Sequence, residues 1–365
     1  MKKYFIFCLA SILVACAVPA TEVSPTKEST APPATSTVNV PSATPEPQPF
    51  LTVFGDEPIV SKGTPGTWDD RFTDPGAVVY YDGLFHMFRN GFRDFPATSQ
   101  VGYVTSPDGY TWIKQGEESV FKTSDVPYAK IAMYASSVLV EDDGAWVIYF
   151  YTWDSAKFPS ASVIGRATAP SPNGPWAADA EPVLKPGSVD EWDARQVLAP
   201  HVIKTKDGYV MYYSGANSAG TQQIGMATST DGIQWAKYNA PATTEAPYME
   251  SDPVLQPGDP ASWDMGWVHQ PRVFETDRGW VMIYRGTKNR DGNNMALGLA
   301  TSIDGVHWNK SSLNPVFLPS EISGANQFWF HNALLVNDTY FIFIEGDINQ
   351  RTQIYLATYE GAIPK

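Results

Sequence analysis

The sequence predicts an all-β fold, a five-bladed β-propeller with four-stranded antiparallel blades. One pattern of about sixty residues recurs five times between Pro58 and the C-terminus, and each copy contains short apolar segments separated by turn residues. A single unit of this kind cannot bury both faces of its sheet, whereas a closed ring of units can. The repeat therefore fixes the architecture before any element is considered alone.

Each repeat begins with a Pro-Val-Leu-like segment, at residues 58–60, 119–121, 182–184, 253–255 and 315–317. A loop follows, and in three repeats this loop carries Trp-Asp, as Trp68-Asp69, Trp192-Asp193 and Trp263-Asp264. Because the dipeptide recurs, we assign its aspartates to loop structure and not to catalysis.

The strands follow in a fixed order. The first begins near residues 74–75, 135–136, 199–200, 270–271 and 331–332, and the aromatic second strand contains residues 86–88, 147–150, 210–213, 281–284 and 341–343. The third ends in Ser-x-Asp-Gly-x-x-Trp at 106–112, 229–235 and 302–308, with a shorter version at 171–176. Asp-Gly favours a tight turn, and we expect the Trp to pack between blades. The last repeat lacks a fourth strand, so residues 51–54 are predicted to supply it and close the ring.

The N-terminal residues predict export. Residues 1–15 combine Lys2 and Lys3 with an apolar run and form a signal peptide too short to remain as a membrane span. Residues 13–16 (Leu-Val-Ala-Cys) resemble a bacterial lipobox, which implies lipidation of Cys16; the alternative is an ordinary signal peptide with a chance cysteine. Residues 16–49 are rich in Pro, Thr, Ser and Ala and are predicted to form a disordered tether, followed by the propeller at 50–365. We expect a lipid-anchored protein at the bacterial cell surface or in the periplasm, attached to the membrane through Cys16.

Composition excludes one large class of partners. The net charge is −14 and the basic residues do not cluster, so nucleic-acid binding is not expected. Cys8 lies within the signal peptide, so the propeller has no cysteine and no disulfide. We expect a monomer that requires no cofactor.

Strand direction predicts where a site must lie. Strands alternate in direction within a blade, so the starts of the first strands, the ends of the second strands and the Trp-Asp loops share one face. The Asp-Gly turns lie on the opposite face. Channel-lining polar residues at the first face are therefore the candidates for function.

Three segments resemble the five-bladed glycosidases of glycoside hydrolase families 43 and 32. Residues 74–76 (Asp-Pro-Gly) resemble the first-blade motif, residues 135–144 the second-blade segment and residues 198–201 (Leu-Ala-Pro-His) the third-blade motif. The resemblance implies glycosidase activity on a carbohydrate, with Asp74 as base or nucleophile. Ala135 and Leu198 stand where the family has the carboxylate that tunes the acid and the general acid itself. Glycoside hydrolysis normally needs two carboxyl groups, so the mechanism is not carried over whole.

Two carboxyl groups are the predicted catalytic residues. Asp74 matches the family's base; the alternatives are a cap of the Trp-Asp loop or a pair with Arg71. Glu345 ends an apolar strand, where burial would raise its pKa, and it is the predicted replacement acid. The alternative is a salt bridge from Glu345 to Arg285 or Arg351.

The predicted substrate contacts are polar or aromatic residues of the same face. The histidines suit hydrogen bonds to sugar hydroxyls or acid chemistry, against the alternative of structural channel residues. The arginines suit an anionic sugar or phosphate, against the alternative of neutralising nearby carboxylates. The predicted set is Arg89, Trp153, His201, His269, Gln270, Arg272, Arg285 and His331. The three histidines have no ligand-type spacing and predict no metal site. Because some relatives hold a central calcium with water and a histidine, the resemblance leaves a structural calcium ion in the channel open.

Three functions remain open. The favoured interpretation is a secreted, lipid-anchored glycosidase that cleaves oligo- or polysaccharide, with Asp74 as base or nucleophile and a non-standard acid. The second is a glycan-binding propeller that has lost catalysis, as Leu198 and Ala135 suggest. The third is a phosphorylase, because the related mannoside phosphorylases use one carboxylate and phosphate.

Overall fold

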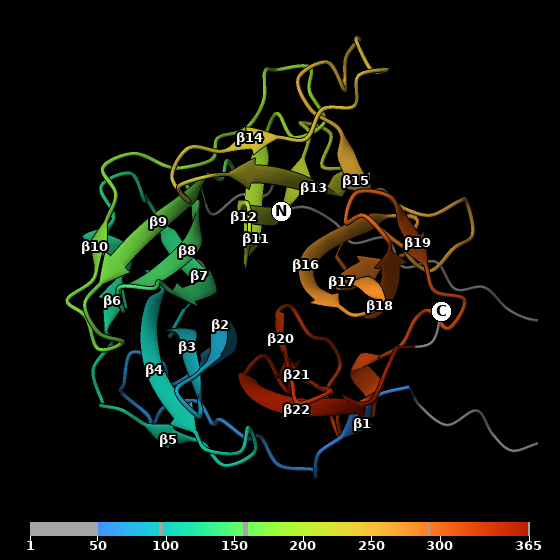
Figure 1. The fold of residues 1–365 in the computed structure, drawn as a ribbon. Coiled ribbons are helices and arrows are strands. Elements are labelled where there is room, and N and C mark those ends of the chain that lie inside the picture. The colour runs from blue at the N-terminus through green and yellow to red at the C-terminus, as the bar shows by residue number, and fades with distance from the viewer. Residues whose placement is uncertain (1–49, 95–97, 156–159, 291, 364–365) are drawn as a thin grey trace, which may run out of the picture. The chain divides into compact units, whose positions relative to one another are not determined.

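The computed structural model describes residues 50–94, 98–155, 160–290 and 292–363, and the regular secondary structure of this part of the chain is almost entirely β-strand. Five antiparallel sheets stand in a ring, with the first strand of each sheet toward the centre (Figure 1). The predicted five-bladed propeller is confirmed. The predicted signal peptide, the tether and Cys16 lie outside the described residues. Among the described residues, no helix has the length and apolarity needed to cross a membrane.

The blades follow one another along the chain. Blade 1 consists of β2 (Phe72–Tyr81), β3 (Leu84–Phe92), β4 (Gln100–Ser106) and β5 (Ile113–Lys114). Blade 2 consists of β7 (Ala132–Val140), β8 (Trp146–Trp153), β9 (Ile164–Ala169) and β10 (Ala177–Ala178). Blade 3 consists of β11 (Gln196–Thr205), β12 (Gly208–Ala216), β13 (Gln222–Ser229) and β14 (Ala236–Lys237). Blade 4 consists of β16 (Trp267–Thr276), β17 (Gly279–Thr287), β18 (Met295–Ser302) and β19 (Trp308–Lys310). Blade 5 consists of β20 (His331–Val336), β21 (Thr339–Asp347), β22 (Thr352–Glu360) and β1 (Thr52–Val53).

The ring is closed by the N-terminal end of the domain. β1 pairs antiparallel with β22, with Thr52 opposite Thr358 and Val53 opposite Ala357. The strand predicted at residues 51–54 is thus the fourth strand of the last blade. Closure leaves no long open sheet edge between the first and last blades.

The Pro-Val-Leu-like segments do not start their own blades. Each pairs with the third strand of the preceding blade: β6 (Phe121–Lys122) with β4, β15 (Pro253–Leu255) with β13, and single bridges join Val60 to Ile354, Leu184 to Ile164 and Phe317 to Leu297. Short 3₁₀ turns follow two of these segments, at Thr123–Asp125 and Pro319–Glu321. The periodicity gave the repeat its length, but not the blade to which its first segment belongs.

The three Trp-Asp loops anchor blades 1, 3 and 4 through a glycine pair in each. The Trp192 ring lies against Gly215 of β12 and Gly225 of β13, where a β-carbon would come within 2.3 and 2.7 Å of it. Trp68 and Trp263 lie in the same way on their own glycine pairs. The neighbouring Asp193 accepts hydrogen bonds from the Tyr213 hydroxyl at 3.1 Å and from Lys237 at 2.6 Å. These aspartates are structural, as the repetition predicted.

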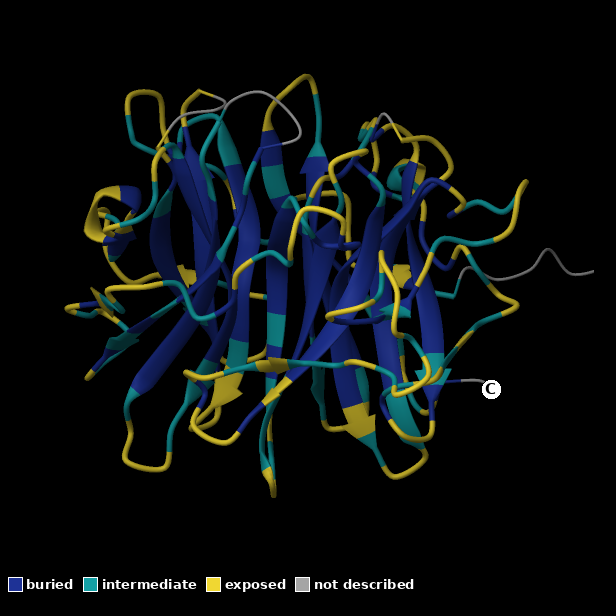
Figure 2. Ribbon diagram, turned by 90° about the horizontal axis from the view of Figure 1, so that it is seen from above, coloured by how far each residue is buried: buried dark blue, intermediate teal, exposed yellow. Residues whose placement is uncertain are grey.

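The Ser-x-Asp-Gly turns join neighbouring blades. In the third blade, Ser229 Oγ accepts the backbone N–H of Gly232, and the Trp235 indole donates to the carbonyl of Gly232. The Tyr149 hydroxyl of blade 2 donates to that same carbonyl at 2.8 Å, and Trp235 packs edge-on against the Tyr149 ring. The predicted inter-blade packing of the Trp is confirmed. Most residues along the strands are buried, and exposed residues gather mainly in the loops at the two faces of the propeller (Figure 2).

We predict that Gly225→Ala destabilises the domain. The added carbon would meet Tyr213 and Trp192 at 2.6 and 2.7 Å, and overpacking of this kind costs about 1–3 kcal/mol. Urea unfolding measures the change, with Thr228→Ala at an exposed position of the same strand as control. Equal unfolding free energies for the two variants would contradict the packing role of the glycine.

Candidate active site

A small cavity lies at the first strands of the blades, where the five sheets meet. Its volume is about 10 Å³, which is room for about one water molecule. It is lined by Asp74, Gly76, Asn90, Ala135, Ser136, Tyr151, Ala199, Gln270, Arg272, Phe330 and His331. All five blades contribute, so the cavity exists only in the assembled ring.

A bulge near the start of the first strand shapes this cavity. The pairing of strands one and two shifts register after Asp74, Ala135, Leu198 and His269 in the first four blades. Gly76 has a positive φ of 46°, and a β-carbon there would lie 2.0 Å from the Phe88 carbonyl oxygen. Gln270, with φ of 51°, adopts the same region despite its side chain. The bulge interrupts the ladder, and in blades 1 and 2 the residue before it, Asp74 or Ala135, lines the cavity.

One position of the second strand recurs as a polar or aromatic ring around the channel. In blades 1 to 4, the residue just before this position pairs with a glycine of strand three; in blade 5 it pairs with Tyr355. The residues at the position itself are Asn90, Tyr151, Ser214, Arg285 and Glu345 in blades 1 to 5. The repeat therefore presents one side chain per blade at this level, and the five side chains differ. The candidate functional side chains thus stand at a position where the sequence of the repeat varies between blades.

Asp74 is the carboxyl group of the cavity. It is 1% exposed, and its Oδ1 accepts hydrogen bonds from the backbone N–H of Gly76 and from Asn90 Nδ2, both at 2.8 Å. Its Oδ2 is buried without a hydrogen-bond partner in the described part of the chain. Burial raises the pKa of Asp74 to about 7, against the opposing effect of these hydrogen bonds. Neither alternative role for Asp74 is observed, since Asp69 occupies the Trp-Asp loop and Arg71 lies 3.7 Å from Asp94.

Glu345 is the second buried carboxyl group at the channel. Its Oε2 accepts the backbone N–H groups of Trp329 and Phe330, both at 3.0 Å. Burial raises its pKa well above the ordinary value, and the nearby Asp74 raises it further. No salt bridge to Arg285 or Arg351 forms within the described residues. The two predicted catalytic residues are thus electrostatic neighbours, although only Asp74 lines the cavity itself.

Two predicted arginines of blade 4, Arg272 and Arg285, lie close to each other near the cavity. Arg272 lines the cavity and donates to the Pro271 carbonyl at 2.8 Å and to Ser136 Oγ at 3.2 Å. Arg285 donates through Nε to His269 Nε2 at 2.7 Å, and its guanidinium lies 5.9 Å from the Phe330 ring centre. Burial lowers their pKa values to about 10 and about 9, so both remain charged at neutral pH.

The three predicted histidines are neutral. Burial, with the nearby arginines, lowers the pKa of His201 to about 3 and those of His269 and His331 well below the ordinary value. His201 Nδ1 accepts the backbone N–H of Val273 and His269 orients Arg285, whereas His331 lines the cavity. An imidazolium acid at neutral pH is therefore not available at these positions.

The remaining predicted contacts divide into two groups. Gln270 lines the cavity, with its Oε1 buried and unbonded in the described chain. Arg89 instead lies under Trp68 and pairs with Asp69 at 2.6 Å, and Trp153 packs on Tyr134. Arg89 and Trp153 are not among the residues that line the cavity.

Five residues that build the site were not among the predicted catalytic residues or substrate contacts. Asn90 binds Asp74 and also exchanges hydrogen bonds with the backbone of Ala135, and Asn332 donates to the carbonyls of Gly76 and Ser136. Ser136, Tyr151 and Phe330 complete the lining. Tyr151 and Phe330 sit in aromatic segments that look like core, so no local signal distinguishes them. Asn90 and Asn332, by contrast, are polar residues at strand ends of the predicted site face, and strand direction alone placed them there without giving them a role.

Calcium does not fit this cavity. Within the described residues, no cluster of three or more acidic or histidine side chains is arranged to hold a metal. Arg272 lies on the cavity wall, and a buried guanidinium opposes a divalent cation.

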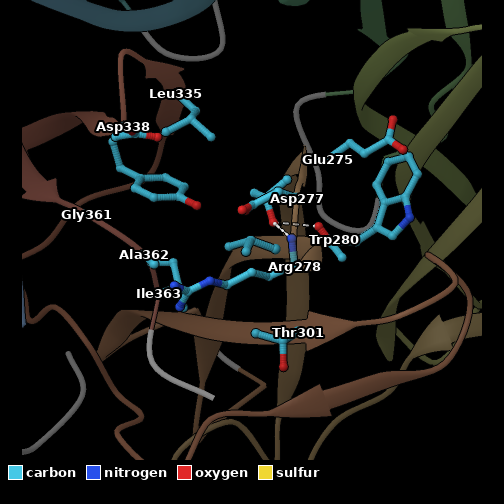
Figure 3. A pocket seen from close by; sticks show the side chains of 14 residues that line it. Glu275, Asp277, Arg278, Trp280, Thr301, Leu335, Asp338, Gly361, Ala362 and Ile363 are labelled. Carbon is cyan, nitrogen blue, oxygen red and sulfur yellow. Dashed lines mark hydrogen bonds between the residues drawn. The ribbon is translucent and has the colours of Figure 1, made fainter.

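A larger cavity of about 500 Å³ lies elsewhere, between the last two blades. It is formed by the β16–β17 turn, by residues around the β20–β21 turn and by the segment 361–363 (Figure 3). Its charged groups, such as Asp277, Arg278 and Asp338, are exposed turn residues at the face opposite the small cavity. Size alone does not make it a site, and the convergent buried polar groups are at the small cavity.

Comparison with known proteins now adds to this geometry. The sequence model of the glycosyl hydrolases family 32 N-terminal domain matches residues 68–270, more than half of the chain. The chain belongs to this family. The match includes Asp74 and Leu198 and ends at Gln270, so Glu345 lies beyond it. No curated protein sequence matches the chain.

Solved structures agree on the fold. A glycosyl hydrolase from Bacteroides ovatus has a TM-score of 0.64 at 17% identity, over 87% of this chain and 95% of its own. A structure titled for the GH130 family of mannoside phosphorylases, said to contain hydrolases that target β-1,2 mannosidic linkages in Candida mannan, has a TM-score of 0.65 at 16% identity, over 87% and 95%. A thermostable family-43 glycoside hydrolase has a TM-score of 0.58 at 14% identity, over 81% and 91%. At such identities the likeness is one of fold.

We predict a pH-dependent stability difference between the protein and Asp74→Asn. The folded state binds the Asp74 proton more tightly than the unfolded chain, so this stabilisation is present below pH 4 and is lost as pH rises through about 7. Between pH 4 and 8 the unfolding free energy should therefore shift in favour of the variant, by at most about 4 kcal/mol.

Denaturant unfolding across this pH range measures the difference. Asp277→Asn, an exposed carboxylate on the opposite face, is the control and should show no such shift. If the difference in unfolding free energy between the unmodified protein and Asp74→Asn stays constant across this pH range, the pKa of Asp74 is not raised.

Proposed function

We propose that this protein is a glycoside hydrolase that cleaves glycosidic bonds of an oligo- or polysaccharide at the small channel cavity. The observation that carries the proposal is the pair of buried carboxyl groups, Asp74 and Glu345, at the centre of a glycosidase-family propeller. Two such groups are the minimum equipment for glycoside hydrolysis. Fold alone would not carry it, because propellers serve many functions.

The environments of the two groups suggest their roles. Asp74, held by Asn90 and Gly76 through one oxygen, keeps the other oxygen free for water or for the sugar carbon, as base or nucleophile. Burial and the nearby Asp74 raise the pKa of Glu345 well above the ordinary value and so favour its protonated form, the form that a general acid needs. Glu345 thereby replaces the acid that the family carries at the position of Leu198.

Access to this pair requires movement. A cavity of about 10 Å³ cannot hold a sugar ring, and Phe330, which is only partly buried, lines it. Displacement of this ring on binding would widen the cavity toward Glu345, whose partners include the Phe330 backbone N–H.

A second candidate function is glycan binding without catalysis. The observation that favours it is the apolar Leu198 at the family's acid position, together with the small cavity. Saturable binding of a glycan without turnover would select this function over the first.

We further propose that the protein is exported and attached to the membrane as a monomer through lipidated Cys16. The support is the sequence of residues 1–49, in which an apolar signal, a lipobox-like segment and a Pro/Thr/Ser-rich tether precede the propeller. This arrangement would place the propeller where extracellular polysaccharide is met.

We expect Asp74→Asn and Glu345→Gln each to lower hydrolysis by about 10²–10⁴-fold, because each removes one proton-transfer group. A glycan-hydrolysis screen with and without phosphate measures this, with Asp277→Asn as control. In the unmodified protein the rate of hydrolysis should rise with pH as Asp74 ionises near pH 7. The rate should fall again once Glu345, whose pKa is raised well above the ordinary value, loses its proton, and Glu345→Gln should remove this fall. Full activity of Asp74→Asn would exclude the proposed mechanism, and strict phosphate dependence would indicate a phosphorylase.

Cys16→Ser should release the protein from the membrane fraction. A thioether-linked lipid needs the Cys16 sulfur, which serine lacks. Fractionation of expressing bacteria measures the distribution, with Ser24→Ala in the tether as control. Retention of the Cys16→Ser protein on membranes would contradict the lipid anchor.

A further inference from the structure

Two buried arginines of blade 4 form no ion pair, although Asp74 lies near Arg272 and Glu345 near Arg285. Arg272 of β16 is 3% exposed and Arg285 of β17 is 5% exposed, yet neither forms an ion pair with a described carboxylate. The third arginine buried to this degree, Arg89, pairs with Asp69 at 2.6 Å. Charges are rarely buried without a partner, so the blade 4 arginines differ from the rest of the molecule.

Neutral groups hold both guanidinium groups in place. Arg272 is oriented by the Pro271 carbonyl and by Ser136 from the second blade, and Arg285 by the ring of His269. These contacts orient the guanidinium groups without neutralising them. Arg272 Nε and Arg285 Nη1 are left buried without a hydrogen-bond partner in the described chain.

Other unused polar atoms gather on the same cavity. Gln270 and His331 line it together with Arg272, and neither ring nitrogen of His331 has a hydrogen bond of good geometry, although the Ile283 carbonyl is close. Burial raises the pKa of Asp74 to about 7 and that of Glu345 well above its ordinary value, which disfavours the charged form of both carboxyl groups. Two guanidinium groups with unused N–H donors beside such carboxyl groups favour an anion.

We propose that Arg272 and Arg285 form an oxyanion-binding subsite of the channel, which takes the carboxylate of an acidic sugar or inorganic phosphate. Guanidinium groups match the geometry of both oxyanions, and binding would supply the direct ion-pair partner that neither arginine has among the described residues. This inference rests on the proposed function, because it names the chemistry of what the same site binds. The cavity holds about one water, so the anion enters as Phe330, which packs over Arg285, moves aside.

The test is ligand binding to the full chain, measured by calorimetry and by thermal shift at constant ionic strength. The probes are glucuronate and galacturonate, their neutral parents glucose and galactose, and inorganic phosphate. The expected result is that at least one anion binds and that Arg272→Gln weakens it about tenfold or more. Arg272→Lys should restore part of the affinity, and Arg278→Gln, an exposed arginine of the same blade, should bind as the unmodified protein does.

The outcomes separate the two sources of the oxyanion. Uronate binding without phosphate binding identifies an acidic sugar, and phosphate binding alone identifies the free ion. If no anion binds better than its neutral counterpart, or if Arg272→Gln leaves binding intact, the inference is overturned. If Arg272→Gln fails to fold, Arg285→Lys and the thermal shift of the unmodified protein decide the same question.

Failure of the inference and failure of the proposed function remain distinguishable. Turnover of neutral glycans with no anion binding would overturn the oxyanion subsite alone. Anion binding without turnover of any glycan would keep the subsite and remove the hydrolase.

Discussion

The burial of Asp74 at the meeting point of five blades is the constraint on which the site depends. A carboxyl group sealed from water would be expelled or permanently protonated without help, and here two hydrogen bonds from Gly76 and Asn90 hold its pKa at about 7. A second buried carboxyl group, Glu345, lies close enough for each to oppose the ionisation of the other. The result is a pair with separated proton affinities, which a single carboxylate in water cannot provide.

Contacts between blades hold these buried groups in place. Asn90 of blade 1 binds both Asp74 and the backbone of Ala135 in blade 2, and Asn332 of blade 5 binds carbonyls of blades 1 and 2. The repeated Trp-Asp loops and the Ser-x-Asp-Gly turns fix each blade and its neighbours at the two ends. Because the repeat supplies the rigidity, one side chain per blade is free to differ at the axis.

The fold followed from the sequence because repetition is a strong signal. Ring closure by residues 51–54 follows from the missing fourth strand of the last repeat, and the structural role of the Trp-Asp loops follows from their recurrence. The face that carries the site follows from strand alternation. The site was predicted only in part. Four of the predicted residues line the cavity: Asp74, Gln270, Arg272 and His331. Arg89 instead forms an ion pair with Asp69. Whether a polar residue faces a channel or a loop depends on local pairing, and aromatic cavity residues such as Tyr151 look like core in a sequence.

The most direct measurement is a titration of the carboxyl carbons of Asp74 and Glu345 by nuclear magnetic resonance, assigned with Asp74→Asn. The account predicts a transition of Asp74 near pH 7, a transition of Glu345 well above its ordinary range, and a lower apparent pKa for Glu345 when Asp74 carries no charge. Transitions of both groups near pH 4, independent of each other, would contradict the buried, interacting pair on which the proposed chemistry rests.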